Sequence, residues 1–468
     1  MNNKLSFGVK TGYGLGMAGE CLAMNTFYIY FIFFLTNAVG LNAGIAGTVS
    51  MVAVFWGAFT DLFAGLKTDA SRNPKGRRRP FIYKAAVPLG VAIFLMYSDW
   101  ASVSPAAKPF YFLIVTMIFW LALSFVDIPY LSLGSEITDD YNERNSIRGI
   151  ANILNYAAMI LASSGTLTLV SLMADERGIG DTGAWSKVGL LFGVLVLGFY
   201  WIAAAATKGK EVPIQNELGV AAAPKGNILK GYLEVLQLRP FRMILYYTVF
   251  AYGGVILFTS AYIYYLYYNM YFDDAQAALV MLIYCFMVMG SSAVLGAIKV
   301  EKKVIVVGLT ILLGAGMILA HFTGLGPGGL YLIFFLFALA ISAYFVQIYS
   351  MVYDVCDVDE FINGGGREGV IVSMFYFVGK VIGGVAMAAV GWILTYAKYD
   401  PALLEQTAQT QVGISFGALL LPGILAIIGA LFMIRYPINQ SNHSALRDAI
   451  EAKKDGREYS VESFKELI

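Results

Sequence analysis

Apolar residues fill most of the chain in long stretches that shorter polar segments separate. A bilayer hydrocarbon core of ~30 Å needs about 20 apolar residues in a single helix. Twelve stretches meet this criterion, near residues 11–38, 43–66, 81–98, 109–134, 147–172, 187–207, 241–270, 275–298, 303–321, 328–353, 368–397 and 412–436. We therefore expect an all-α polytopic membrane protein with twelve transmembrane helices.

Basic residues in the loops predict how these helices are oriented. The connection between the second and third spans contains GRRRP at 76–80, and the connection after the sixth span holds further lysines and arginines. The loops on the other side hold only Lys108, Arg177, Lys187 and Lys398. Because positive charge marks the cytoplasmic side, both termini are expected in the cytoplasm of a bacterial-type plasma or inner membrane.

The longest connection divides the spans into six plus six. We expect an N-terminal half at 1–206, a cytoplasmic middle loop at 207–240, a C-terminal half at 241–438 and a cytoplasmic tail at 439–468. The sequence of the tail, SALRDAIEAKKDG, predicts a solvated and partly helical segment.

A weak internal repeat supports two parallel halves. The fourth span ends in GSEITDDYNER and runs on to Arg148, and the tenth ends in YDVCDVDEF and runs on to Arg367. Each is an acidic helix end followed by a polar loop and a basic residue. Such duplication is typical of secondary transporters.

Composition excludes several other classes of protein. The chain is 58% hydrophobic and 13% charged, whereas soluble domains are about 25% charged. A net charge of +1 argues against nucleic acid as a partner. Cys21, Cys285 and Cys356 lie in or beside apolar spans without metal-ligand spacing, so we expect buried thiols. There is no Walker A sequence for ATP-driven transport, and no cofactor is expected.

Four charged residues lie inside predicted spans and away from the span ends: Glu20, Asp61, Asp127 and Lys380. Since a charge at the bilayer centre costs about 3 kcal/mol, such residues normally face a bundle interior or a water-filled path. A carboxyl group in a low-dielectric cleft can carry a proton, and several oxygens can hold a hard cation such as Na⁺. Lys380 could neutralise the empty site. An ion-pair network that only holds helices together remains the alternative, especially for Asp61 beside its basic loop.

One face of the fourth span combines chemistry suited to a sugar. Trp120, Ser124, Asp127 and Leu131 recur at helical spacing and share this face. An aromatic ring can stack on a sugar while a carboxylate binds its hydroxyls. A packed polar helix face is the alternative interpretation.

Several motifs, in order, resemble those of a known transporter family. They are GYGLGMAGE at 12–20, DLFAG at 61–65, GRRRPF at 76–81, DIPY at 127–130, RGIA at 148–151, YDVCDVDEF at 353–361 and GKVIGG at 379–384. Over nearly all of its membrane region the chain resembles the glycoside–pentoside–hexuronide:cation symporters, the melibiose-permease-like branch of the major facilitator superfamily. The resemblance implies the major facilitator fold and transport by alternating access.

The resemblance also implies roles for individual residues. Glu20, Asp127 and Arg148 match positions that bind the sugar. Asp61 matches a carboxylate of the cation site, with Asp127, Ser124 and Thr60 beside it. Lys380 matches a lysine linked to that site and is counted with the substrate-binding residues. Trp120 with Tyr344 or Phe345 could supply an aromatic surface.

Three departures from the family pattern change the expected specificity. Gly57 stands in place of a second carboxylate one turn before Asp61, Leu131 replaces a tryptophan, and Gly19 replaces a basic residue. We therefore expect H⁺ as the coupling cation rather than Na⁺, although Na⁺ at Asp61 and Asp127 stays possible. The substrate is expected to be a sugar or glycoside other than melibiose, carried by a functional monomer.

Two alternatives stay open. A lysolipid or other amphiphile carrier of related fold would suit Leu131 and the apolar walls. A membrane-embedded enzyme is the other, because five acidic residues loosely resemble the Mg²⁺–diphosphate motifs of intramembrane prenyltransferases: Asp139, Asp140, Asp354, Asp357 and Asp359. Twelve spans and charges near the midplane argue against an enzyme.

Overall fold

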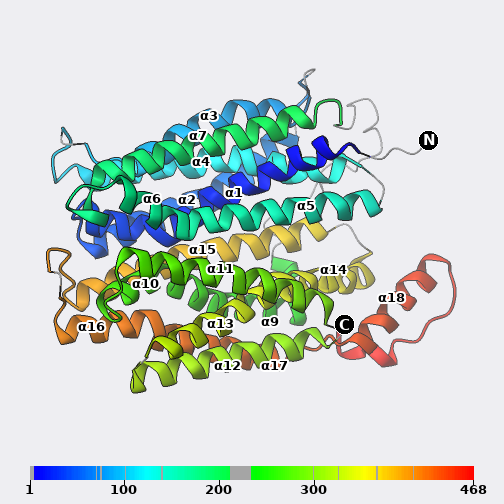
Figure 1. The fold of residues 1–468 in the computed structure, drawn as a ribbon. Coiled ribbons are helices and arrows are strands. Elements are labelled where there is room, and N and C mark those ends of the chain that lie inside the picture. Colours follow the sequence, from blue (N-terminus) through cyan, green and yellow to red (C-terminus); the bar gives the residue numbers. More distant parts are fainter. Residues whose placement is uncertain are drawn as a thin grey trace. The chain divides into compact units, whose positions relative to one another are not determined.

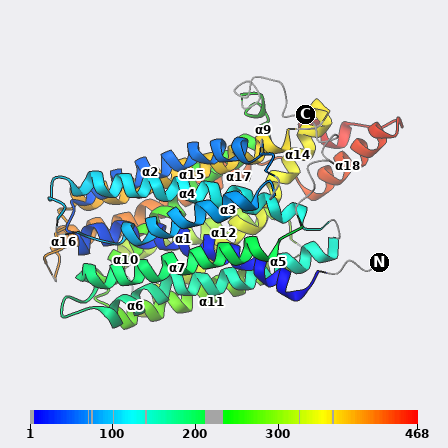
Figure 2. The same cartoon turned by 90° about the horizontal axis from the view of Figure 1, so that it is seen from above.

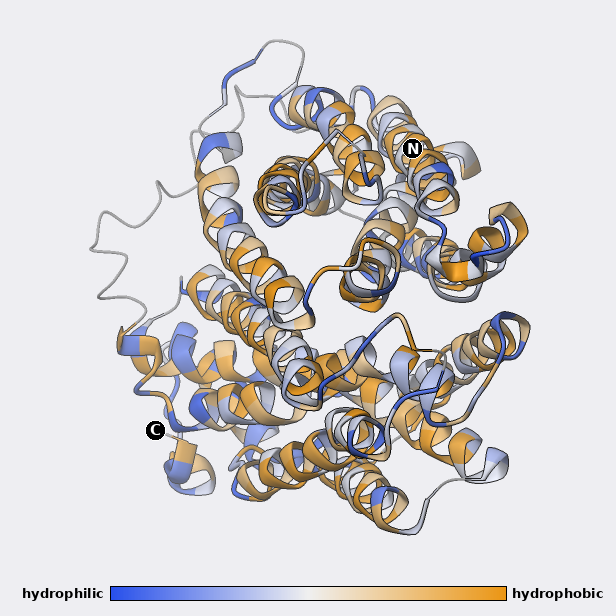
Figure 3. Cartoon of the chain, turned by 90° about the vertical axis from the view of Figure 1, so that its left-hand side faces the viewer, coloured by the Kyte–Doolittle hydropathy of each residue, from blue (hydrophilic) through white to orange (hydrophobic). Residues whose placement is uncertain are grey.

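The chain is helical throughout the described residues, as the computed structural model shows (Figure 1). The structure describes residues 5–69, 71–73, 76–100, 102–138, 141–210, 233–298, 300–324, 326–364, 367–403 and 405–467. Within these ranges twelve helices are long and apolar enough to cross a membrane. Figure 3 shows apolar residues, in orange, along these helices. The prediction of a twelve-span all-α membrane protein is confirmed.

The chain folds as two compact units. Unit 1 comprises Met1–Val220, Thr259–Cys285 and Met387–Ile414, and unit 2 comprises Ala221–Phe258, Phe286–Ala386 and Ser415–Ile468. The boundary therefore differs from the expected one at the middle loop, because parts of α10, α11, α15 and α16 belong to unit 1. The expected division into halves stays a prediction, and residues 211–232 of that loop lie outside the described residues.

Unit 1 is built around the first helix. α1 packs against α5 and α7, α2 against α4, and α3 against both α4 and α7; Figure 1 shows α3, α4 and α7 side by side. Ser6 caps α1, since its hydroxyl accepts a hydrogen bond from the Val9 amide at 3.4 Å. The helices of this unit are α1 (Phe7–Phe33), η1 (Phe34–Ala38), α2 (Ala43–Asp69), α3 (Arg79–Met96), α4 (Lys108–Glu136), α5 (Tyr141–Ile160), η2 (Leu161–Gly165), α6 (Thr166–Met173), η3 (Gly178–Gly180) and α7 (Thr182–Ala206).

Four further helices are shared between the units. They are α10 (Gly253–Tyr268), α11 (Asp274–Ala297), α15 (Glu368–Tyr396) and α16 (Ala408–Ser415). The basic residues of the loops predict that the ends of these helices in unit 1 lie on the outer side of the membrane. There the first half meets the second: Thr36 Oγ1 lies 2.7 Å from Tyr264 Oη, and the Gly44 amide donates to Thr395 Oγ1 at 2.7 Å.

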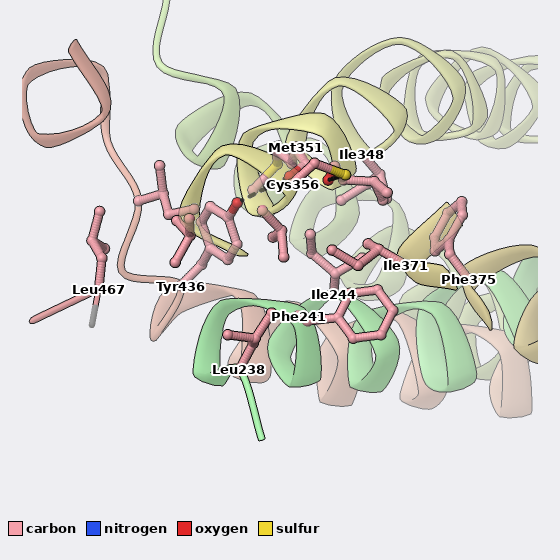
Figure 4. Close-up of a cluster of buried hydrophobic side chains, with 14 of the residues drawn as sticks. Leu238, Phe241, Ile244, Ile348, Met351, Cys356, Ile371, Phe375, Tyr436 and Leu467 are labelled. Atoms are coloured by element: carbon pink, nitrogen blue, oxygen red, sulfur yellow. Dashed lines mark hydrogen bonds between the residues drawn. The ribbon is translucent and has the colours of Figure 1, made fainter. Parts of the chain in front are cut away.

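Unit 2 holds a buried apolar cluster beside the C-terminal segment (Figure 4). α12 packs between α13 and α17. The remaining helices of this unit are α9 (Arg239–Tyr247), η5 (Thr248–Tyr252), α12 (Lys302–Thr323), α13 (Pro327–Ala343), η6 (Tyr344–Ile348), α14 (Tyr349–Asn363), η7 (Phe416–Leu420), α17 (Leu421–Ile434), α18 (Gln440–Lys454) and η8 (Glu462–Leu467).

The C-terminal segment is partly helical and largely exposed, as predicted, but one face of it is buried. α18 packs on α14, and Figure 2 shows the two helices next to each other. Leu446 and Ile450 are buried, and Phe464 and Leu467 of η8 join the apolar cluster. The alternation of apolar and polar residues in α18 gives one buried and one exposed face, which a composition-based argument does not reveal.

Five short π-helical segments interrupt the helices of the described residues: η1, η2, η5, η6 and η7. Such segments often lie at functional positions, because the extra residue per turn re-aims side chains. η1 carries Thr36 and Asn37 at the outer end of α1, and η6 carries Tyr344 and Phe345.

Candidate functional site

Three tyrosines from α1, α4 and α7 form a packed group in unit 1. The rings of Tyr13 and Tyr130 stack with centroids 4.7 Å apart, and Tyr130 Oη donates to the Tyr13 carbonyl at 2.8 Å. Tyr200 meets Tyr130 edge-on at 5.7 Å. Tyr130 and Tyr200 are buried, so this group is a fixed aromatic wall.

Two of the charged residues of the membrane spans gather at this wall. Glu20 on α1 and Asp127 on α4 each interact electrostatically with Tyr13, Tyr130 and Tyr200. Both carboxylates are partly exposed. The two carboxylates can accept hydrogen bonds from sugar hydroxyls, whereas the buried Tyr130 and Tyr200 rings offer no surface for stacking in this conformation.

Arg148 on α5 belongs to the same neighbourhood. It interacts electrostatically with Tyr13 and is exposed. The structure therefore brings together the three residues predicted to bind a sugar: Glu20, Asp127 and Arg148.

Sequence reasoning missed the tyrosine wall. Its signal is the glycine pattern of α1, because a Cβ atom at Gly16 would lie 2.3 Å from Tyr130 Cε2. Gly134 on α4 likewise leaves room for the hydroxyl of Tyr13, which would lie 2.1 Å from an added Cβ. Small residues on both helices thus make space for large ones. The buried Tyr200 hydroxyl has no hydrogen-bond partner within the part of the chain that the structure describes.

A second group joins α2 and α4 around Asp61. The Ser124 hydroxyl donates to Asp61 Oδ1 at 2.6 Å and lies 2.8 Å from Thr60 Oγ1. Ser124 and Thr60 are buried, whereas Asp61 is partly exposed. These are three of the four residues that the sequence predicts for cation coupling, and the structure joins them in one hydrogen-bonded chain.

The remaining predicted site residues differ in how far their side chains are exposed. Trp120 is 0% exposed, so it offers no surface to a substrate in this conformation. In unit 2, Tyr344 is 3% exposed and stacks on Tyr252 with centroids 4.4 Å apart, while Phe345 is 48% exposed. Lys380 is partly exposed on α15, also in unit 2. Substrate contacts by these residues stay a prediction.

The acidic residues of α14 are engaged by basic partners in unit 2. Lys302 Nζ lies 2.7 Å from Asp354 Oδ2, and His443 Nε2 lies 2.8 Å from Asp357 Oδ2. Arg367 pairs with Asp359. No cluster of metal-ligating side chains occurs within the described ranges, and Asp139 and Asp140 fall outside them. The arrangement gives no support to an aspartate-rich Mg²⁺ site.

Comparison with known proteins identifies the family. The family described as MFS/sugar transport protein matches residues 12–440. The chain belongs to the glycoside–pentoside–hexuronide:cation symporter family of the major facilitator superfamily. It is thus a multi-pass membrane transporter and not an enzyme.

The names of this symporter's relatives refer to several kinds of substrate. It is 26% identical to the inner membrane symporter YicJ of Escherichia coli K12, covering 98% of this chain and 97% of the relative. It is 27% identical to the putative glycoside/cation symporter YagG of the same strain, covering 89% and 88%. A putative sulfoquinovose importer of Salmonella typhimurium is 25% identical and covers 99% and 97%.

Solved structures support the fold of the symporter. The crystal structure of a D-xylose–proton symporter matches with a TM-score of 0.65 at 12% identity, covering 92% of this chain and 98% of the other. At this identity the match shows the major facilitator fold alone. The predicted fold and family are confirmed.

Proposed function

We infer that the protein couples the uptake of a neutral sugar or glycoside to protons. The observation that carries this inference is the position of two residues on α4. Ser124 hydrogen-bonds Asp61, and Asp127, three residues later, interacts electrostatically with Tyr200, as Glu20 does. One helical turn therefore links the candidate cation group to the candidate sugar site, so occupancy of one can affect the other.

The charges of the candidate site favour a neutral substrate. Glu20 and Asp127 bring two carboxylates to the tyrosine wall, and Arg148 brings one guanidinium group. A sulfonate such as sulfoquinovose would place a further negative charge beside two carboxylates. Sugar hydroxyls instead donate hydrogen bonds to them.

Protonation of Asp61 fits its surroundings. A proton needs one carboxylate oxygen, and the Ser124 and Thr60 hydroxyls can reorient to serve either the charged or the neutral acid. Loading a proton and a sugar would remove unpaired charge from the path and permit alternating access.

A sugar panel provides the first test. Purified protein is heated with neutral sugars, glycosides and sulfoquinovose at two pH values, with Na⁺ or with choline. Ligands that bind the native state raise the melting temperature, and we expect this from a neutral sugar without Na⁺. A response to sulfoquinovose alone would overturn the assigned substrate class.

Uptake of the sugar so identified tests the coupling ion. We expect accumulation driven by an inward proton gradient in Na⁺-free medium. Asp61→Asn should abolish uphill accumulation while sugar exchange across the membrane persists. Strict dependence on Na⁺ at fixed pH contradicts proton coupling, and full accumulation by Asp61→Asn removes Asp61 from the mechanism.

A further inference from the structure

Gly57 on α2 lies against the indole of Trp120 on α4. A Cβ atom built on Gly57 would lie 2.7 Å from Trp120 Cε3 and 2.8 Å from Cδ2, closer than real Cβ contacts come. The indole therefore occupies the volume that any side chain at position 57 would need.

The indole is held in place by its neighbours. Trp120 is 0% exposed and meets Phe27 edge-on at 5.3 Å and Phe119 at 5.6 Å. Tyr28 adds a third edge contact at 6.2 Å. Because protein interiors are close-packed, the ring has no free volume into which it could retreat.

This contact lies one helical turn from the Asp61 group on both helices. Gly57 precedes Asp61 by four residues, and its carbonyl accepts a hydrogen bond from Thr60 Oγ1 at 3.0 Å. Trp120 precedes Ser124 by four residues, and its carbonyl accepts from Ser124 Oγ at 2.9 Å. The indole thus occupies the space beside the Asp61 group that a side chain at position 57 would need in order to bring an oxygen atom there.

We propose that the Gly57–Trp120 contact determines ion specificity, because the indole excludes the additional oxygen ligand that a metal cation would need beside Asp61. A dehydrated hard cation takes about six oxygen ligands, whereas a proton takes one. The Asp61 carboxylate with the Thr60 and Ser124 hydroxyl oxygens supplies fewer ligands than that, so a metal cation would need a further oxygen here. This inference rests on the proposed function, which assigns cation coupling to Asp61.

The proposal predicts that an acidic residue at position 57, combined with a small residue at position 120, creates a Na⁺ site. Gly57→Asp, Trp120→Ala and the double variant are purified, and their melting temperatures are measured in NaCl and in choline chloride at one pH. We expect a rise of about 2 °C or more in Na⁺ only for the double variant. Gly57→Asp alone should melt lower than wild type, because its carboxylate collides with the indole.

Two controls separate space from the oxygen ligand. Gly57→Leu with Trp120→Ala fills a similar volume without any side-chain oxygen and should not respond to Na⁺. If Trp120→Ala leaves too large a void for the double variant to fold, Gly57→Asp with Trp120→Val fills part of it and is measured in the same way. Binding of ²²Na⁺ to the purified variants provides a readout that needs no sugar.

The outcomes distinguish this inference from the proposed function. Na⁺-dependent uptake by the wild-type protein would refute proton coupling itself. Proton-driven uptake by the wild type, together with folded double variants that neither bind ²²Na⁺ nor melt higher in NaCl, would overturn the role of the Gly57–Trp120 contact alone.

Discussion

Tyr399 donates a hydrogen bond of 2.6 Å to the side-chain oxygen of Asn37. The same oxygen accepts a second bond of 2.7 Å from Tyr268. Asn37 ends the first span, whereas Tyr268 ends α10 and Tyr399 follows α15. One amide therefore joins the first half of the chain to two elements of the second at the outer ends. Alternating access requires this junction to open.

Replacing Asn37 should favour the state in which the outer ends are apart. Each lost hydrogen bond contributes about 1 kcal/mol, so Asn37→Ala should shift the equilibrium by about 2 kcal/mol, or roughly 30-fold. A single cysteine at Ala388, which is buried at the outer end of α15, reports opening through its rate of labelling by a membrane-impermeant thiol reagent in cells. The three native cysteines are free and buried, as predicted, and are replaced in this background.

Asn269→Ala is the matched control for this measurement. The Asn269 amide donates to the Gln411 carbonyl at 3.0 Å, a bond between α10 and α16 within the second half of the chain. Its loss should leave labelling at Ala388→Cys unchanged. Equal labelling of the Asn37→Ala and Asn269→Ala variants would show that the Asn37 junction does not hold the outer ends closed.

The outer junction should not respond to pH in the physiological range. Burial raises the pKa of the Tyr399 phenol above its ordinary value. Because the pKa of the Tyr399 phenol is higher in the folded than in the unfolded protein, this group contributes its full stabilisation below the unfolded pKa of about 10. The stabilisation is lost only as the pH rises through the pKa of the folded protein. The labelling rate at Ala388→Cys, corrected for the thiolate fraction at each pH, should therefore have the same pH dependence with and without Asn37→Ala between about pH 5.5 and 8.5, far below that range. A corrected rate whose pH dependence changes in Asn37→Ala would place a titrating group in the junction.

A glycine contact provides a second, independent part of the outer closure. A Cβ atom on Gly391 of α15 would lie 2.2 Å from the Ala43 carbonyl of α2. Gly391→Ala should therefore force the two helix ends apart, raise labelling of a cysteine at the outer end and destabilise the closed state by about 1–3 kcal/mol. Gly198→Ala on α7 is the control, because no atom lies within 4 Å of its added Cβ. Closure that is unaffected in Gly391→Ala would show that α2 and α15 can separate without consequence.

The fold and part of the candidate site could be predicted from the sequence. Long apolar stretches and loop charges are local properties, so the spans and their orientation could be predicted. Glu20 and Asp127 could also be selected from the sequence, because a charge in an apolar span is unusual, and their role in the site stays a prediction. The tyrosine wall was not found, since Tyr13, Tyr130 and Tyr200 are ordinary membrane residues until three helices pack. The Gly57–Trp120 contact was missed for the same reason, because it depends on the register between α2 and α4.

The ion pair between Arg367 and Asp359 should be the most sensitive to truncation of one partner among the pairs that hold α14. Asp359 is 2% exposed, and Arg367 Nε donates to its Oδ2 at 3.0 Å while Nη1 donates to Glu234 Oε2 at 2.6 Å. The hydrogen bond to Asp359 raises the pKa of the Arg367 guanidinium, so this cation stays charged at every accessible pH. Arg367→Ala would leave a buried carboxylate without its counter-charge, which costs about 3–5 kcal/mol.

Thermal unfolding of purified variants checks this expectation against an exposed pair. Arg457→Ala removes an arginine that is 64% exposed beside Asp455, which is 61% exposed, and should cost at most about 1 kcal/mol. Asp359→Asn combined with Arg367→Gln removes both charges and should melt above Arg367→Ala, because no carboxylate is then left buried and unpaired. If Arg367→Ala instead melts with the Arg457→Ala control, water reaches Asp359 and the pair contributes little to holding α14 in place.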